Sequence, residues 1–458
     1  MKKKSFGDFT DSINGISDTT EKKIDSDYIY TPEIKKILET LDSNAKEQKF
    51  ILLLGSAGTG KSTFIQIAKN KLKKNIAVVA PTGIAALNAG GRTVHSFFRI
   101  DPRQLIPTPT YLTGTTALVV EKLDLLIIDE ISMLNAPLLD AISSSLKMNK
   151  KSSLPFGGLS VLACGDIFQL EPVVKKQERD ILLNQYPTHF FFGAHCLHDL
   201  VPTIFQLNKS FRHESDTKYL KLLDNIRLGQ NLDQTIKVIN QSCFKDHDEK
   251  KVGLVLTTQN APAEVINQTR LEALNTPLKE YESTSTGDFS LKNDYQLPAP
   301  RNLRLKKGAK VLMVKNDPDK RWVNGSTGKV ISLKDNKIEV EIENEIHEVQ
   351  RVSWEEIDYK WDKKKKQVIE NTKGVYIQFP LRLGWAITVH KSQGLTLDSV
   401  SVDLGERAFA HGQAYVALSR CKALKDVFLK RELRKDDIQI NEQILSFHNH
   451  FLNEDNSI

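Results

Sequence analysis

The feature that most constrains the fold is a short glycine-rich loop near the start of the chain, GSAGTGKS at residues 55–62. It follows an apolar run, FILLLG (50–55), and it opens an amphipathic stretch that begins at Lys61. This spacing of glycines, lysine and serine between a strand and a helix is typical of a phosphate-binding loop. The glycines let the backbone curl, so that N–H groups and the helix N-terminus point at phosphate oxygens. We therefore expect an α/β sheet that carries a nucleotide at this loop.

The residue types around the loop predict the chemistry of phosphoryl transfer. We expect nucleotide contacts from the whole loop and the first turn of the helix: Gly55, Ser56, Ala57, Gly58, Thr59, Gly60, Lys61, Ser62 and Thr63. Lys61 is expected to reach the β- and γ-phosphates, and the Ser62 hydroxyl is expected to ligate magnesium.

Two carboxylates and a glutamine follow later strands of the same expected sheet. Asp129 and Glu130 end the apolar run 125–128. Asp129 is a second candidate ligand for magnesium, and Glu130 is a candidate to orient or deprotonate the attacking water. Gln169 lies in a polar turn after another strand and is a candidate to contact the γ-phosphate.

Apolar runs alternate with helical patterns along most of the chain. The runs at 50–55, 76–81, 123–129 and 159–166 are continuous, which indicates burial on both faces of a parallel sheet. A second such series stands at 202–207, 252–260, 400–405 and 426–433. Between them, the runs at 305–317, 324–333 and 337–354 alternate polar and apolar residues, with turn residues between the runs. The sequence thus predicts two α/β domains, with a small antiparallel barrel inserted in the second.

These patterns divide the chain into segments. We expect a disordered tail at 1–28, with an unidentified protein partner possible, a first domain at 29–200, a second domain at 201–300 and 376–440, the inserted barrel at 301–375, and a C-terminal helix and tail at 441–458. A Pro- and Thr-rich stretch at about 99–121 is expected to project from the first domain as an insertion.

Composition narrows the class of partner. The 458 residues carry a formal net charge of +7, which favours an anionic partner, nucleic acid first, although a merely solvated lysine-rich surface would explain it equally well. The four cysteines include no CxxC pair, so neither a disulfide framework nor a zinc site is expected. No stretch approaches eighteen apolar residues, and the first residues lack a signal-peptide pattern. We expect a protein of the cell interior without a membrane partner, cytoplasmic and nucleoid-associated in a bacterium or nuclear in a eukaryote.

Seven blocks of the sequence occur in a fixed order. They are GSAGTGKS, APTGIAALNAGGRTVHSFF (80–98), IIDEISM (127–133), GDIFQLEPV (165–173), LNKSFRH (207–213), TVHKSQGLTLDSV (388–400) and AYVALSRCK (414–422). Together they resemble the PIF-type DNA helicases, named for petite integration frequency, in the RecD-like branch of helicase superfamily one. The resemblance runs from about residue 30 to 435, and the combination of GIAALNAGG with HKSQG separates this group from other phosphate-loop ATPases.

The resemblance implies two RecA-like parallel-sheet domains, with a small wedge insertion in the first and the β-barrel in the second. It also implies that ATP with magnesium binds in the cleft and drives 5′ to 3′ movement along single-stranded DNA, with unwinding of duplex or forked DNA. Gln169 matches the γ-phosphate sensor, and Arg212 and Arg420 match the arginines that the second domain brings to the γ-phosphate. The family's adenine-reading glutamine has no clear counterpart, because Gln48 stands too close to the first strand.

A DNA track is expected along loops at strand ends of both domains, where α/β sheets place their ligands. The candidate contacts are Pro81, Thr82, Gly83, His95, Phe97, Phe98, Thr257, Thr258, Asn260, Thr388, His390, Lys391 and Ser392. Phe97 and Phe98 are expected to stack on bases, although at least one of them is equally expected in the core. Tyr111 is a candidate strand-separating pin in the wedge. Gln393 and Gly394 are expected nearer the cleft, where they would sense ATP.

Three other functions share parts of this pattern. A superfamily-one RNA helicase would differ in the strand that stimulates its ATPase. A translocase that displaces bound proteins would move along DNA without unwinding it. A phosphate-loop ATPase acting on proteins or membranes would lack the HKSQG and GIAALNAGG blocks.

Overall fold

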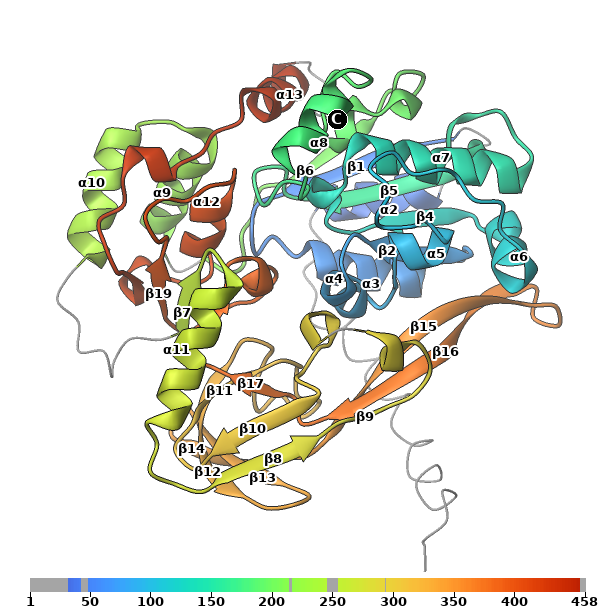
Figure 1. Ribbon diagram of the computed structural model, residues 1–458. Coiled ribbons are helices and arrows are strands. Elements are labelled where there is room, and N and C mark those ends of the chain that lie inside the picture. Colours follow the sequence, from blue (N-terminus) through green and yellow to red (C-terminus); the bar gives the residue numbers. More distant parts are fainter. Residues whose placement is uncertain (1–31, 43–47, 214–215, 245–253, 293, 454–458) are drawn as a thin grey trace, which may run out of the picture.

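The computed structural model describes residues 32–42, 48–213, 216–244, 254–292 and 294–453. Two separate parallel sheets and an antiparallel region make up the described chain (Figure 1). This confirms the expected α/β class with two sheet domains and an inserted β region. The tail expected at 1–28 and the last residues, 454–458, lie outside the described residues.

The first sheet has six parallel strands in the order β3-β2-β4-β5-β1-β6. The strands are β1 (Phe50–Gly55), β2 (Ile76–Ala80), β3 (Arg92–Thr93), β4 (Leu125–Ile128), β5 (Ser160–Gly165) and β6 (Thr203–Leu207). The assignment of residues 202–207 to the second domain is wrong, because β6 pairs in register with β1, Ile51 opposite Thr203. The strand that carries the phosphate-binding loop therefore lies between β5 and β6.

Helices cover both faces of this sheet, which is why its strands are apolar throughout. They are α2 (Pro32–Asp42), α3 (Lys61–Lys71), α4 (Gly83–Ala89), α5 (Val94–Phe98), α6 (Gly114–Lys122), α7 (Ala136–Lys150) and α8 (Lys176–Leu183). On β1, Ile51 and Leu53 pack in one core with α2 and α3, whereas Leu52 packs in the other core with α7. The insertion is irregular only to about residue 113, since residues 114–122 form α6.

The second sheet has four parallel strands in the order β18-β7-β19-β20. Its strands are β7 (Leu254–Thr257), β18 (Ala386–Thr388), β19 (Val400–Asp403) and β20 (Val427–Leu429), and its helices are α9 (Thr217–Leu228), α10 (Leu232–Cys243), α11 (Asn260–Glu272) and α12 (Gln413–Leu418). The polar block at 388–398 begins at the end of β18, where a short 3-10 turn spans His390–Ser392.

The inserted region is antiparallel and larger than expected. One core joins strands β8 (Leu278–Glu282), β10 (Asn302–Lys306), β11 (Lys310–Met313), β12 (Thr327–Leu333), β13 (Ile338–Ile342), β14 (Glu345–Val349) and β17 (Leu381–Leu383). Residues 301–375 are therefore too narrow a boundary, since β8 and β17 complete the same core from outside it. The short β9 (Thr284–Ser285) pairs with the long strand β16 described next.

A long hairpin, β15 (Val352–Asp362) and β16 (Gln367–Gln378), runs from the inserted region to the first domain (Figure 1). The Val78 N–H donates to the Tyr359 hydroxyl at 3.0 Å, and the Tyr359 ring meets Phe97 edge-on at 5.8 Å between centroids. Arg92 and Asp358 form an ion pair at the same junction. The hairpin thus packs on the first domain.

The last helix, α13 (Glu442–Asn453), returns from the second domain to the first (Figure 1). The Phe447 ring stacks on Phe192 with centroids 4.3 Å apart, and the Thr188 hydroxyl donates to Gln443 at 2.7 Å. His448 is buried against Phe168 because this helix packs on the first domain.

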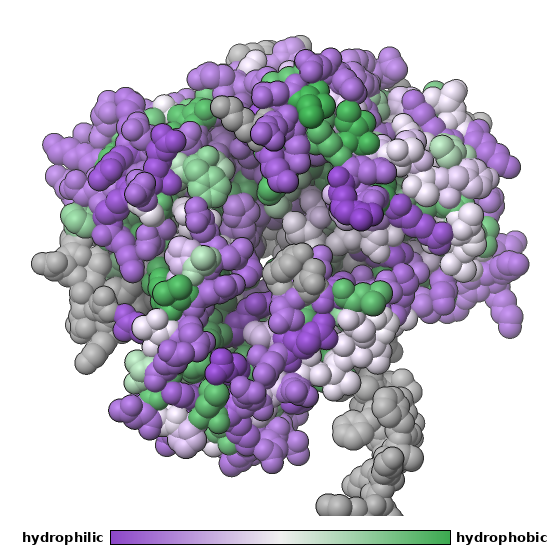
Figure 2. Space-filling model, in the orientation of Figure 1, coloured by the Kyte–Doolittle hydropathy of each residue, from purple (hydrophilic) through white to green (hydrophobic). Residues whose placement is uncertain are grey.

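The outer surface is mainly hydrophilic on the face shown in Figure 2, with apolar residues in separate patches. Within the described ranges, no helix combines the length and the apolar character needed to cross a bilayer. The four cysteines, Cys164, Cys196, Cys243 and Cys421, are all buried, and no disulfide joins them.

Candidate active site

The phosphate-binding loop connects β1 to α3 with the expected backbone shape. Gly58 and Gly60 adopt φ angles of +81° and +87°, a conformation that favours glycine. The Lys61 ammonium folds over the loop and donates to the carbonyl oxygens of Gly55 at 2.7 Å and Ser56 at 3.0 Å. Burial lowers the pKa of Lys61, while nearby carboxylates oppose that shift. The loop is therefore formed in advance, with its lysine near the position of a phosphate.

Asp129 and Glu130 stand directly after β4, close to this lysine. Asp129 is 7% exposed, and its carboxylate accepts a hydrogen bond from the Glu130 N–H at 2.9 Å. Burial raises the pKa of Glu130, and the neighbouring charge of Asp129 raises it further. A carboxylate whose pKa is raised toward neutrality is suited to accept a proton from water.

The residues present fit a magnesium ion bound together with a nucleotide. Ser62 is exposed at the first turn of α3, and it and Asp129 offer the oxygen ligands that magnesium prefers. Among the described residues, no group of three or more His, Cys, Asp or Glu side chains forms a metal site by itself. That fits magnesium, because this ion keeps several waters and takes one or two protein ligands plus phosphate oxygens.

Gln169 lies in the turn that follows β5, at the mouth of the same site. It is 5% exposed, and its amide donates to the Asp166 carboxylate at 3.1 Å. Its side-chain carbonyl oxygen accepts a hydrogen bond from the Gln393 amide of the second domain at 3.3 Å. Gln393 also donates to the Glu130 carboxylate at 3.0 Å. One side chain of the second domain thus touches both the candidate base and the candidate γ-phosphate sensor.

The two domains meet closely at this point. A Cβ atom on Gly412 of the second domain would lie 2.4 Å from the backbone carbonyl oxygen of Gln169, so only glycine fits there. Gly394, the other predicted nucleotide contact in the HKSQG block, is exposed, and a Cβ atom there would have no neighbour within 4 Å. Gln393 therefore reaches the cleft, whereas Gly394 shapes the turn beside it.

Arg212 and Arg420 lie at the cleft with their guanidinium groups held by the second domain. Arg212 stands against Gly58 of the phosphate-binding loop and donates to the Thr396 hydroxyl at 3.0 Å. Arg420 is 1% exposed and donates to backbone oxygens, including that of Ser392 at 3.1 Å. Their predicted contact with a γ-phosphate stays a prediction, and it requires both groups to exchange these partners.

Gln48 is occupied away from the cleft. Its side-chain amide donates to the carbonyl oxygens of Pro155 and Leu159, which lie beyond the start of β1 and β5. This agrees with the sequence argument that Gln48 is not the adenine-reading glutamine.

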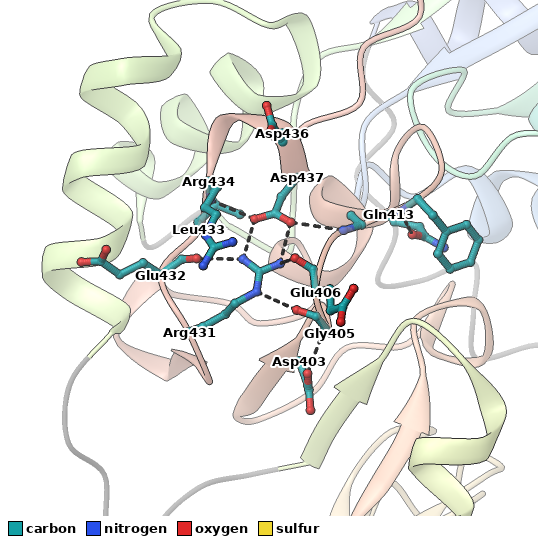
Figure 3. Close-up of polar contacts among 12 residues, drawn as sticks. Asp403, Gly405, Glu406, Gln413, Arg431, Glu432, Leu433, Arg434, Asp436 and Asp437 are labelled. Atoms are coloured by element: carbon teal, nitrogen blue, oxygen red, sulfur yellow. Dashed lines mark hydrogen bonds and ion pairs between the residues drawn. The ribbon is translucent and has the colours of Figure 1, made fainter.

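An ion-pair hub supports the loop that leads to Gly412 (Figure 3). The Arg431 guanidinium donates to both carboxylate oxygens of Asp437 at 2.7 Å and to the Gly405 carbonyl oxygen at 2.7 Å. Asp437 also accepts from the Ala408 N–H at 3.2 Å. Burial alone would raise the pKa of Asp437, but these hydrogen bonds outweigh it and hold the pKa below its usual value. The hub thus fixes the start of the loop that presses on Gln169.

Sequence reasoning missed a tyrosine of this interface. Tyr415, on α12, is 4% exposed, and its hydroxyl contacts both the phosphate-binding loop and Asp166. The signal was present, since Tyr415 lies in the AYVALSRCK block, but its apolar neighbours favoured a core position.

Candidate DNA contacts of the second domain line a second feature, a cavity of about 520 Å³. It lies between α4 of the first domain, α11 and β18 of the second, and β11 and β15 of the inserted region. Asn260, Thr388 and Lys391 line it, opposite Ile84, the residue after the predicted loop Pro81, Thr82 and Gly83. Arg382 and Trp354, which the sequence did not single out, also line it. A groove with cationic and aromatic side chains is suited to a single strand of nucleic acid.

The prediction that Phe97 and Phe98 stack on bases is wrong for this structure. Both side chains are 0% exposed, and their rings meet edge-on at 4.8 Å between centroids. They belong to the main core of the first domain, and the Tyr359 ring of the hairpin covers Phe97. His95, on the same helix, is partly exposed and stays a candidate.

Two predicted hydroxyl contacts are turned inward. Ser392 is 0% exposed and donates to the Val389 carbonyl oxygen at 2.7 Å, and Thr257 donates to that of Gln259 at 2.7 Å. The Thr388 hydroxyl accepts from the Lys391 N–H at 3.3 Å. Ser392 and Thr257 thus shape the loops, and their predicted phosphate contact is corrected to a supporting role, whereas Thr388 lines the cavity and stays a predicted contact. His390, Lys391 and Thr258 are partly exposed and Asn260 is exposed, so they stay predicted DNA contacts.

The wedge insertion presents Tyr111 to solvent. Its side chain is 61% exposed, on an irregular segment that Asn149 of α7 holds through the Leu112 N–H at 2.9 Å. An exposed ring on an anchored loop is compatible with the predicted pin, which stays a prediction.

Comparisons with known proteins agree with this geometry. The model of the family described as PIF1-like helicase matches residues 30–237. The ATP-dependent DNA helicase Pif1 of Bdellovibrio bacteriovorus is 32% identical over 87% of this chain and 87% of its own length. The zebrafish (Danio rerio) helicase PIF1 is 30% identical, but this chain spans only 61% of its length.

Solved structures extend the likeness to the whole described fold. Pif1 from Bacteroides sp in complex with ADP-AlF4 is 34% identical, with a TM-score of 0.85 over 94% of this chain and 99% of that one. The Bacteroides Pif1 bound to ssDNA superposes with a TM-score of 0.66 at 33% identity, over 94% and 99% of the two chains. Identity above 30% across nearly complete bacterial relatives, with the same ordered motifs and the same fold, places this chain in the PIF1-like helicase family.

Proposed function

We propose that this protein is an ATP-dependent DNA helicase that translocates 5′ to 3′ on single-stranded DNA and unwinds duplex or forked DNA. The observation that carries the proposal is the position of one loop, residues 389–394. Gln393 reaches Glu130 and Gln169 in the nucleotide site, while Lys391, two residues earlier, lines the cavity of predicted DNA contacts. A shift of this loop would therefore act on both sites at once.

Each side chain then has a distinct task. Lys61 and the loop N–H groups bind phosphate oxygens, and Glu130 accepts the proton of the attacking water. Magnesium, when bound, neutralises the charge that develops on the transferred phosphoryl group. Arg212 and Arg420 reach the γ-phosphate only when the second domain closes on the first, so hydrolysis depends on closure. DNA supplies that closure by binding the strand-end loops of both domains.

Solved relatives support this proposal. Helicases named Pif1 have been solved bound to ssDNA and at forked dsDNA, at 33% identity to this chain. We infer the same substrates here, with ATP and magnesium as cofactors. Because the substrate is DNA, we expect the protein in the nucleoid of a bacterium or in the nucleus of a eukaryote.

Unwinding of tailed duplexes tests the proposal. With ATP and magnesium, the protein should separate a duplex with a 5′ single-stranded tail and leave the 3′-tailed and untailed duplexes intact. DNA should also stimulate ATP hydrolysis more than a matched RNA strand. Lys61→Ala should lower the stimulated rate on the order of 10²-fold or more while single-strand binding persists.

The exposed Lys73, just beyond the same helix, offers the matched control. Lys73→Ala removes the same kind of charge from beyond the opposite end of the helix, away from the nucleotide site, and should keep the wild-type rate. Unwinding by Lys61→Ala at the wild-type rate, or stimulation by RNA alone, would overturn the proposal.

A further inference from the structure

The hydroxyl of Tyr415 is the point where helix α12 of the second domain touches the phosphate-binding loop of the first. The Ala57 N–H donates to this hydroxyl at 3.3 Å. The hydroxyl in turn donates to the Asp166 carboxylate at 3.0 Å. Both contacts cross between the domains, and all three residues are buried.

Asp166 passes this contact on to Gln169. It is 2% exposed, and the carboxylate oxygen that accepts from Tyr415 also accepts from the Gln169 amide at 3.1 Å. Its other oxygen accepts from the Phe168 N–H at 3.2 Å. The carboxylate therefore holds the turn that carries Gln169, and Tyr415 holds the carboxylate.

The side-chain oxygen of Gln169 faces the candidate general base. Its carbonyl oxygen accepts from Gln393 at 3.3 Å, and Gln393 donates to Glu130 at 3.0 Å. A continuous chain of hydrogen bonds thus runs from Tyr415 through Asp166, Gln169 and Gln393 to the candidate general base.

Removing the Tyr415 hydroxyl would leave two buried groups short of a partner. Asp166 would lose one of its donors, and the Ala57 N–H would lose its acceptor, which is costly in a buried site. Burial raises the pKa of Tyr415, and the charge of Asp166 raises it further, so the hydroxyl keeps its proton and remains a donor.

We propose that Tyr415 is a positioning residue for ATP hydrolysis, which orients Gln169 through Asp166 only while helix α12 is seated on the phosphate-binding loop. The inference rests on the proposed function, and it adds a residue that couples closure of the cleft to the orientation of Gln169. Because Gln169 acts on the γ-phosphate, the effect falls on the transition state more than on binding of the nucleotide.

The variant Tyr415→Phe, in the full chain, tests this directly. It removes one oxygen and keeps the buried ring. The kcat of DNA-stimulated ATP hydrolysis should fall about tenfold, while the KM for ATP changes less than about twofold, the pattern of an interaction made in the transition state. ADP with aluminium fluoride should also bind about tenfold more weakly, whereas ADP alone should bind as to the wild type.

Tyr219→Phe is the matched control. Tyr219 is fully buried in the same domain, and its hydroxyl donates to the Leu418 carbonyl oxygen of the same helix α12 without reaching the first domain. It should lower the melting temperature and leave kcat within about twofold of the wild type.

The inference is overturned if Tyr415→Phe keeps the wild-type kcat, or if both variants lose kcat equally, since the second result would mean a purely structural role. It is equally overturned if ADP binding weakens as much as binding of the aluminium fluoride complex. These outcomes leave the helicase proposal standing, because that proposal is tested on the wild-type protein and on Lys61→Ala, not on Tyr415→Phe.

Discussion

Replacement of Gly412 by alanine should separate folding of the domains from closure of the cleft. Gly412 precedes α12 with a φ angle of +75°, and it faces the backbone of the turn that carries Gln169. A Cβ atom there would lie 2.4 Å from the Gln169 carbonyl oxygen and 2.7 Å from that of Phe168. Both neighbours are backbone atoms, so no side chain can rotate away to make room.

The size of the effect follows from that distance. Ordinary van der Waals contact begins at 3.4 Å, so the two domains must separate by about 1 Å at this point. A misplacement of that size at an active site costs about 10²-fold in rate, which corresponds to roughly 2.7 kcal/mol in the barrier. The left-handed backbone adds about 1–2 kcal/mol to the cost of folding.

Gly405→Ala is the control for the backbone cost. Gly405 lies in the same loop with a φ angle of +62°, and a Cβ atom there has nothing within 4 Å. Both variants should lose similar unfolding free energy in a urea titration, and only Gly412→Ala should lose DNA-stimulated ATP hydrolysis, by about 10²-fold. A Gly412→Ala rate within twofold of the Gly405→Ala rate would refute the reasoning, because hydrolysis would then not need this contact.

Two further predictions concern the hub and the core. Asp437→Asn should lower the unfolding free energy by roughly 1.5–3 kcal/mol, the contribution of charge-assisted hydrogen bonds between buried Asp437 and the partly buried Arg431. The Asp437 pKa is held below its usual 3.8 in the folded protein. The stability that Asp437 contributes is therefore complete above that pH and is lost as the pH falls through the lower folded-state pKa. Urea titrations at pH 7 and pH 3 should show a smaller acid-induced loss of unfolding free energy in the variant than in the wild type. Phe98→Ala should cost about 3–5 kcal/mol of unfolding free energy without a specific loss of DNA affinity, whereas Tyr111→Ala should leave stability within about 0.5 kcal/mol. A stable Phe98→Ala protein that binds DNA poorly would restore the base-stacking role.

The parts that sequence reasoning predicted well are those set by local pattern. The phosphate-binding loop needs glycine at 58 and 60 for its backbone, and its flanking strand and helix are visible in the same twenty residues. Buried parallel strands are equally plain, since covering on both faces leaves no polar position. The positions of Asp129 and Gln169 follow because both end strands of one sheet.

The errors have a different origin, because each depends on a partner distant in the sequence. The sequence predicts a strand at residues 202–207, but only its pairing with β1, about 150 residues earlier, assigns that strand to the first sheet. Phe97 and Phe98 were expected to stack on bases, but the hairpin places the Tyr359 ring against Phe97, and both phenylalanines lie in the core. The sequence did not single out Tyr415, because its two hydroxyl partners belong to the other domain.

The return of α13 to the first domain has a consequence for synthesis of the chain. Thr188 and Gln443, which hydrogen-bond across that contact, are 255 residues apart. At about 5–20 residues per second, a ribosome needs roughly 10 to 50 seconds to supply the second partner after the first. During that interval the first sheet can already form, but the ring of Phe192 lacks the Phe447 ring that stacks on it. The packed surface of the first domain is therefore completed only after the second domain has been synthesised.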